Sequence, residues 1–131
     1  KIAYVEQQQF LGYGALDEFF GLGSGSLSRA TVEKILGTLR LDKFVKLLSE
    51  SDFLKGDATA VSGGEKMRLL VAKAMLSDAD LLVFDEPTTG LDDETRKIVV
   101  DSISKLSLNK PVICVTHDAY MIQKANHVLT L

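Results

Sequence analysis

Four stretches of the chain carry the apolar pattern of β-strands. Residues 81–84 (Leu-Leu-Val-Phe) and 111–116 are nearly continuous apolar runs, as expected of strands that are buried on both faces of a parallel sheet. Residues 2–5 form a shorter β-prone run that stops at three glutamines, and residues 128–131 predict a last strand. The pattern therefore predicts a sheet built mainly in the second half of the chain, with one contribution from its beginning.

Between and after these runs, apolar residues recur at helical spacing. Ser62 opens a predicted helix that runs to about residue 76, and Asp92 or Asp93 caps one that runs to about residue 106. Asp118 caps a further predicted helix. Because strands and helices alternate here, the sequence predicts an α/β protein with a parallel sheet.

The first half of the chain carries a different pattern. Ser28 can cap a helix over residues 29–39, and a second short helix is predicted over residues 43–48. Residues 21–26 are glycine and serine with one leucine, a composition typical of a flexible hinge or linker. We therefore expect a small all-helical insertion in this part of the chain.

Bulk properties exclude several classes of protein without choosing a function. The 131-residue chain is 46% hydrophobic and 25% charged, which is typical of a globular protein of one domain. A net charge of −3 gives no general attraction to nucleic acid or to acidic membranes. Neither a membrane-spanning run nor a signal peptide is visible. Cys114 has no disulfide partner, so we expect it to be a small buried hydrophobe and the compartment to be reducing. The chain starts at Lys1 without an initiator Met, which suggests a fragment.

The first candidate site is the acidic pair that follows the apolar run at residues 81–84. Asp85 and Glu86 stand where that strand would end, and ligands bind at the carboxyl ends of parallel strands. Carboxylate oxygens suit Mg²⁺, and a second carboxylate can orient a water for attack on a γ-phosphate. A pair of solvated loop acids is the alternative.

The second candidate is an anion site at the start of a predicted helix. Ser62, Gly63 and Gly64 would present backbone N–H groups and a hydroxyl where the helix dipole favours negative charge. The alternative is a helix cap in which Glu65 completes a capping box with the serine. One serine can serve both purposes.

The third candidate is a histidine at the end of the predicted strand over residues 111–116. There His117 could hydrogen-bond a γ-phosphate or the attacking water. An ordinary loop histidine is the alternative, and it is our interpretation of His127, which no motif surrounds.

Together these motifs resemble those of the ATP-binding-cassette (ABC) ATPase superfamily. Residues 61–66 (Val-Ser-Gly-Gly-Glu-Lys) are similar to its signature motif, and residues 81–87 to its Walker B strand with the following glutamate. Residues 90–92 (Gly-Leu-Asp) resemble its D-loop, His117 its switch histidine, and residues 2–7 its Q-loop strand with Gln7 as the glutamine. The resemblance covers nearly the whole chain.

For the nucleotide bound in the same cassette, the resemblance implies four roles. Asp85 would hold Mg²⁺, and Glu86 would be the general base for the attacking water. His117 would contact the γ-phosphate, and Gln7 would link the magnesium shell to the helical subdomain. ATP and Mg²⁺ are the implied cofactors.

Other residues would serve a second cassette, because members of this superfamily pair head to tail around two ATP molecules. Ser62, Gly63 and Gly64 would bind the γ-phosphate of the ATP held by the opposite cassette, and Asp92 would help to position that cassette.

The resemblance also implies a fold and a division of the chain. It predicts a partial P-loop NTPase-type parallel sheet with an inserted helical subdomain. Residues 1–9 would be the Q-loop strand, residues 10–61 the helical subdomain and residues 62–131 the signature helix with the remaining core. No phosphate-binding G-x-x-x-x-G-K-[ST] loop occurs in the chain, so we expect the chain alone neither to bind ATP tightly nor to hydrolyse it, and to be poorly stable.

The branch of the superfamily stays open at this point. Glu6 and the stretch His-Asp-Ala-Tyr at residues 117–120 favour the ABC-F group, cytoplasmic ATPases that act on ribosomes and tRNA. The stretch Thr-Thr-Gly-Leu-Asp at residues 88–92 is instead typical of the nucleotide-binding subunit of a transporter, which drives a membrane permease from the cytoplasmic side. Half of a chromosome-maintenance cassette and a non-catalytic scaffold are further alternatives.

Overall fold

A computed structural model describes residues 1–131, in which three parallel strands form the main sheet. The strand order is β1 (Ile2–Glu6), β4 (Leu81–Asp85) and β5 (Val112–Val115). Glu6 is paired with Asp85, and Asp85 with Val115, so the three strands end side by side. The predicted α/β architecture with a partial P-loop NTPase-type sheet is therefore present.

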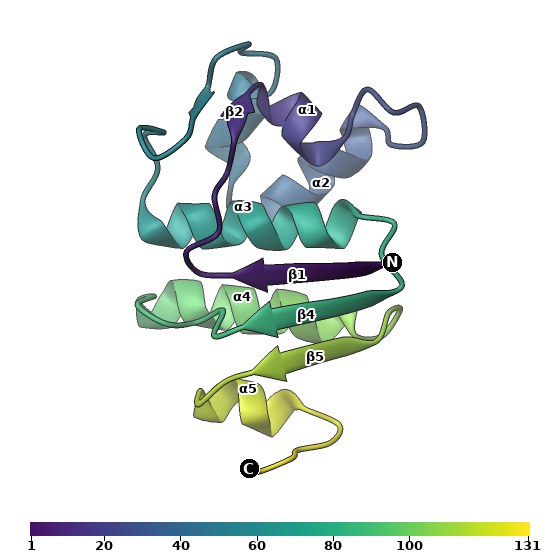
Figure 1. The fold of residues 1–131 in the computed structure, drawn as a ribbon, viewed down its shortest axis with the longest axis vertical. Helices are drawn as coiled ribbons and strands as arrows, with labels where there is room; N and C mark the ends of the chain where they lie inside the picture. Colours follow the sequence, from purple (N-terminus) through teal and green to yellow (C-terminus); the bar gives the residue numbers. More distant parts are fainter.

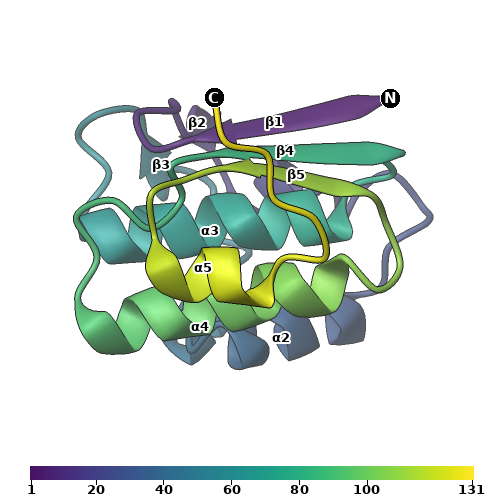
Figure 2. The same cartoon turned by 90° about the horizontal axis from the view of Figure 1, so that it is seen from below.

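Two long helices cover one face of this sheet, and the other face carries no helix (Figure 2). The helices are α3 (Gly63–Leu76) and α4 (Asp93–Leu106), and their buried side chains pack against Val5, Leu82 and Phe84 in a single core. The exposed large apolar side chains of the open face are Ile2, Tyr4, Ile113 and Val115. The expectation that residues 111–116 form a strand buried on both faces is wrong, because alternate residues of β5 point to a face that nothing covers.

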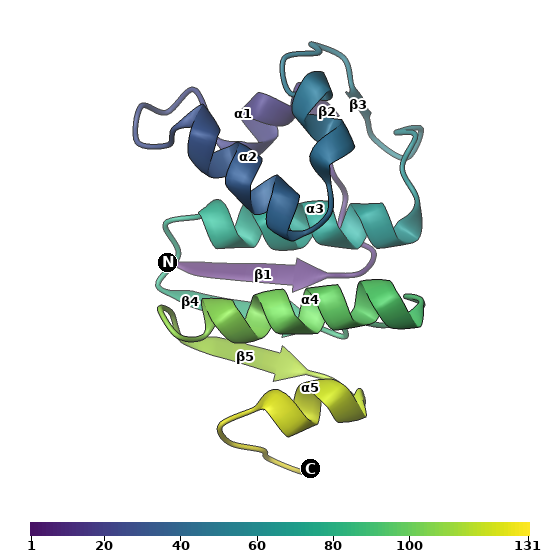
Figure 3. The ribbon, with the colours of Figure 1, turned by 180° about the vertical axis from the view of Figure 1, so that it is seen from behind.

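A smaller layer packs on the side of α3 that is remote from α4 (Figure 3). It contains α1 (Leu16–Phe20), α2 (Arg29–Thr38) and the 3₁₀ helix η1 (Asp42–Leu47). It also contains a two-stranded antiparallel ribbon of β2 (Tyr13–Gly14) and β3 (Leu54–Lys55), so the expectation of an all-helical insertion is wrong. Residues 21–26 form the turns that join α1 to α2, and the Ser24 hydroxyl donates to the carbonyl of Gly21 at 2.8 Å.

Side-chain caps fix the starts of the longer helices where the sequence predicted them. The caps are Ser28 for α2, Ser62 for α3, Asp92 for α4 and Asp118 for α5 (Ala119–Lys124), and each accepts a hydrogen bond from a backbone N–H of the first turn. All three strands of the main sheet point towards the same side of the molecule, and α3 and α4 begin there (Figure 1). One edge of the fold therefore gathers strand carboxyl ends and helix amino ends, which is where anionic ligands bind in α/β proteins.

The last residues form no strand, so the prediction for residues 128–131 is wrong. These residues have no neighbouring strand to supply the hydrogen bonds that a β-strand needs. None of the helices has the length and hydrophobicity that a membrane span requires. Cys114, expected to be a small buried hydrophobe, is half-buried, and burial raises the pKa of its thiol to about 11.

Candidate functional site

The acidic pair lies at the shared end of the strands, as the sequence predicted. Asp85 is the last residue of β4, and the backbone N–H of Glu86 donates to the carbonyl of Val115 at 2.8 Å. Glu86 has a φ of 49°, a left-handed conformation that costs a residue with a Cβ about 1–2 kcal/mol. Strain of this kind is concentrated at functional sites, where the surrounding fold enforces it.

His117 lies beside this pair. Its Nε2 is 3.6 Å from Oε1 of Glu86, although the two residues follow different strands. The imidazole is 98% exposed and the Glu86 side chain 33% exposed, so both face open solvent at the edge of the sheet. The structure therefore places three of the predicted site residues, Asp85, Glu86 and His117, at the shared carboxyl ends of β4 and β5.

A contact that was not predicted from the sequence involves the Asp85 carboxylate. The phenol of Tyr4 donates a hydrogen bond to Oδ2 of Asp85 at 2.6 Å. This hydrogen bond is the main cause that raises the pKa of Tyr4, with burial and the negative charge of Asp85 adding to it. The strand alternation of residues 2–6 could have placed Tyr4 on the face of Glu6, but only the register with β4 reveals the contact with Asp85.

Asp118, the residue after His117, connects the end of β5 to α4 through Arg96. Asp118 accepts from Nη1 of Arg96 at 3.2 Å on each carboxylate oxygen, and also from the backbone N–H of Met121 at 3.0 Å. Its side chain is nearly buried, and burial alone would raise its pKa, but these hydrogen bonds and one from Thr88 hold the pKa below its usual value. The sequence predicted Asp118 as a helix cap, and nothing in it signalled the ion pair with Arg96.

Ser62 makes the predicted capping box. Its Oγ accepts from the backbone N–H of Glu65 at 3.1 Å, and Oε1 of Glu65 accepts from the backbone N–H of Ser62 at 3.0 Å. Lys43, on η1, forms an ion pair with the other carboxylate oxygen of Glu65. Burial raises the pKa of Glu65, but the Lys43 and Ser62 contacts outweigh it and lower the pKa overall.

The side-chain amide of Gln7 contacts the loop that follows β4. Its Nε2 donates to the carbonyl of Thr89 at 2.8 Å. A Cβ added at Gly90, whose φ is +77°, would lie 3.3 Å from the same nitrogen, so glycine allows this close approach. Gln7, Gly63 and the turn around Gly90 line one cleft of about 510 Å³, whose walls do not include Asp85, Glu86 or His117.

The start of α3 packs against the start of α4. A Cβ at Gly64 would lie 3.4 Å from Cγ2 of Thr95 and 3.7 Å from Cδ2 of Leu91. Asp92 caps α4 through a 2.7 Å hydrogen bond from the Thr95 backbone, and this bond lowers the pKa of Asp92. Gly64 and Asp92 are thus close in the fold.

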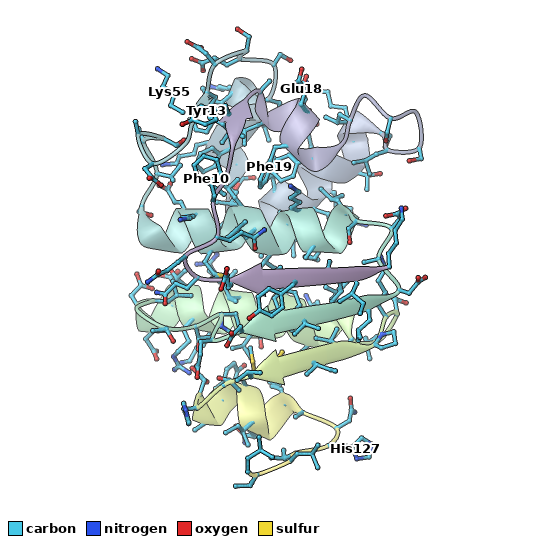
Figure 4. All side chains as sticks on the ribbon, viewed as in Figure 1. Phe10, Tyr13, Glu18, Phe19, Lys55 and His127 are labelled. Carbon is cyan, nitrogen blue, oxygen red and sulfur yellow. The ribbon has the colours of Figure 1, made fainter.

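His127, which no motif surrounds, lies in the C-terminal tail, on the side of the molecule away from the strand ends (Figure 4).

The side chains available as metal ligands determine which kind of Mg²⁺ site the protein can form. No cluster of three or more His, Cys, Asp or Glu side chains is present, so a cage made only of protein ligands does not fit. Mg²⁺ commonly takes one or two carboxylates and completes its shell with waters and substrate phosphates. The Asp85 carboxylate at the ligand-binding edge of the sheet fits that second type of site.

The sequence also matches a protein-family model and several known proteins. A family model described as ABC transporter matches residues 1–89. Similar proteins include an ATP-dependent lipid A-core flippase of Xanthomonas euvesicatoria pv. vesicatoria, 33% identical over 139 residues, and the heterocyst differentiation ATP-binding protein HepA of Nostoc sp., 29% identical over 133 residues. The ABC transporter B family member 21 of Arabidopsis thaliana is 28% identical over 133 residues.

Each alignment covers 100% of this chain but only part of the relative. The chain spans 23% of the flippase, 22% of HepA and 10% of the Arabidopsis protein. These relatives agree with the transporter alternative of the sequence analysis. They do not support the ribosome-associated interpretation or its ribosome and tRNA partners.

Proposed function

The chain belongs to the ABC transporter family, and we propose on this basis that it forms the catalytic part of a cassette that hydrolyses ATP to drive transport. The observation that carries the proposal is the 3.6 Å approach of His117 to Glu86, beside Asp85, at the carboxyl ends of β4 and β5. The ends of two strands, β4 and β5, together supply the groups that in-line attack on a γ-phosphate requires.

Each residue of this cluster has a distinct proposed role. Glu86 accepts a proton from the water that attacks the γ-phosphate, and His117 donates a hydrogen bond to a γ-phosphate oxygen. Asp85 holds Mg²⁺ at the strand end, where the bound ion would neutralise negative charge on the phosphates. The strained backbone of Glu86 keeps its carboxylate at the edge of the sheet, next to His117.

The amino end of α3 serves a different nucleotide in the proposed mechanism. Ser62, Gly63 and Gly64 present the hydroxyl and backbone N–H groups of a helix start, and we infer that they bind the γ-phosphate of ATP held by a second cassette packed head to tail. The close packing of Gly64 on the first turn of α4 joins this surface to Asp92, which we assign to positioning the second cassette. Gln7, bound to Thr89, connects β1 to the same loop.

A membrane permease is the proposed partner, because the similar proteins named above include a flippase and a transporter. The surface that follows Gln7 supports this partner. Phe10 and Tyr13 are exposed aromatic side chains, with Tyr13 75% exposed. Tyr13 lies in β2 opposite Lys55 of β3, and Phe10 packs edge-on against Tyr13 (Figure 4). In the full-length protein, a Tyr13→Cys variant should cross-link to a cysteine placed in the permease, whereas a Leu108→Cys variant, at an exposed position in the turn that follows α4, should not.

The central test is ATP turnover by the full-length protein and its Glu86→Gln variant. We expect Glu86→Gln to stop hydrolysis while ATP remains bound, because the amide keeps the shape of the side chain and cannot accept the proton. Glu50→Gln, at an exposed position of the helical layer, is the matched control and should hydrolyse ATP normally. Unchanged turnover in Glu86→Gln would refute the assignment of the base and with it the catalytic interpretation of this chain.

A further inference from the structure

The side chain of Tyr4 is aimed at the carboxylate that the proposed function assigns to Mg²⁺. In the parallel pair of β1 and β4, Glu6 is the partner of Asp85, and Tyr4 lies two residues earlier on the same face of β1. Tyr4 and Asp85 are therefore diagonal neighbours on the sheet face opposite α3 and α4. Their contact is a phenol-to-carboxylate hydrogen bond of 2.6 Å, a length typical of charge-assisted O–H···O⁻ bonds.

Burial does not explain why a tyrosine occupies this position. Tyr4 is 49% exposed, whereas its neighbour Val5 points into the core. Phenylalanine or a β-branched residue would suit the open face of a strand equally well. The hydroxyl is the distinguishing group, and Asp85 is the one partner that it has.

The hydrogen bond has a definite consequence for Asp85. The terminal torsion of an aspartate side chain is broad, so an unrestrained carboxylate rotates freely about it. A donor on Oδ2 fixes that rotation and leaves Oδ1 free. Carboxylates that bind metals are commonly held in this way by hydrogen bonds, and loss of such a partner typically lowers metal affinity by about 10- to 100-fold.

We propose that Tyr4 is a positioning residue for Asp85, holding one carboxylate oxygen so that the other is presented to Mg²⁺. The proposal rests on the proposed function, because it assumes that Asp85 binds the metal. It adds a residue from the strand before the Q-loop to a site that is otherwise assigned to the ends of β4 and β5.

The test is Mn²⁺ binding to the full-length protein in the presence of a non-hydrolysable ATP analogue, followed by electron paramagnetic resonance. Tyr4→Phe removes only the hydroxyl, and we expect it to weaken Mn²⁺ affinity by about 10-fold. Tyr120→Phe is the matched control, because it removes a second tyrosine-to-aspartate hydrogen bond, the 2.8 Å contact with Asp101, and should leave Mn²⁺ affinity unchanged. Affinity for the analogue without metal should be the same in both variants, which separates a metal effect from a folding defect.

Two results would overturn the proposal. One is Mn²⁺ binding by Tyr4→Phe within twofold of the parent protein, and the other is tighter binding, which would make the tyrosine a competitor of the metal. Asp85→Asn separates these failures from failure of the proposed function. If Asp85→Asn loses Mn²⁺ binding but Tyr4→Phe keeps it, only the role of Tyr4 is wrong. If Asp85→Asn binds Mn²⁺ normally, the proposed metal site is wrong as well. In the Asp85→Asn background, adding Tyr4→Phe should have no further effect.

Discussion

Nη1 of Arg96, on α4, lies 3.2 Å from both carboxylate oxygens of Asp118, the residue directly after His117. Asp118 also caps α5, so a single carboxylate joins the end of β5, the start of α5 and the first turns of α4. His117 itself is exposed and has no comparable anchor. Its backbone is flanked by this ion pair and by the 2.9 Å hydrogen bond from the Asp118 N–H to the Thr116 hydroxyl.

We predict that this ion pair makes stability depend on pH. The folded-state pKa of Asp118 is below its usual value of about 3.9, so its contribution to stability is fully present above about pH 4 and is lost as pH falls through the folded pKa. Asp118→Asn should lower the melting temperature of the full-length protein at pH 5–7, and the difference should shrink below about pH 4. Thermal unfolding at several pH values measures this, and Glu50→Gln controls for the change in net charge. A difference that stays constant from pH 7 to pH 3 would contradict the prediction.

The backbone of Glu86 supports a second prediction. Because its φ is 49°, Glu86→Gly should be more stable than Glu86→Ala by about 1 kcal/mol, since both variants lose the carboxylate and only glycine relieves the left-handed strain. Both variants should be inactive in ATP turnover. Equal melting temperatures for the two variants would show that the strain at this position carries no cost.

Much of the fold could be predicted because its signals are local. Ser62, Asp92 and Asp118 cap helices at the predicted positions, since a side chain that accepts from the next turn depends on only four residues of sequence. The helix α1 escaped prediction because Ala15 precedes it and gives no side-chain cap. Strands depend on distant partners, which is why the two-residue strands β2 and β3 were missed.

Some features of the candidate site could likewise be predicted from local sequence, and others could not. Asp85, Glu86 and His117 could be placed at one edge because parallel strands end together. The sequence could not place Gln7 on the carbonyl of Thr89 or Tyr4 on Asp85, since both contacts depend on the register and loop geometry of residues about 80 positions apart. Nor could it reveal the strain at Glu86, because the backbone angle is imposed by the hydrogen bond to Val115 and the turn that follows.

A third prediction separates the two roles of Ser62. Ser62→Ala should lower stability by about 1 kcal/mol through loss of the cap, whereas Ser62→Asp should keep the cap and most of the stability. Both variants should impair nucleotide-dependent pairing of cassettes, because the alanine lacks the hydroxyl and the aspartate repels the γ-phosphate. Ser28→Ala is the matched control, since Ser28 caps α2 through a 3.2 Å bond from Thr31 and should affect stability alone. Normal pairing in Ser62→Asp, followed by light scattering with ATP, would argue that Ser62 is only a cap.

The last prediction concerns His117, whose side chain is almost fully exposed and approaches Glu86 at 3.6 Å. His117→Ala should therefore change the melting temperature very little, because surface substitutions outside a network usually alter stability by less than about 0.5 kcal/mol. ATP turnover should nevertheless fall by about 10²–10³-fold, the usual loss for one donor to a developing charge. His127→Ala, in the C-terminal tail, is the matched control and should leave turnover unchanged. In the double variant with Glu86→Gln the two losses should combine less than additively, because residues that act on the same water and phosphate form one catalytic unit. If the losses of turnover add fully in the double variant, His117 and Glu86 do not act in the same catalytic step.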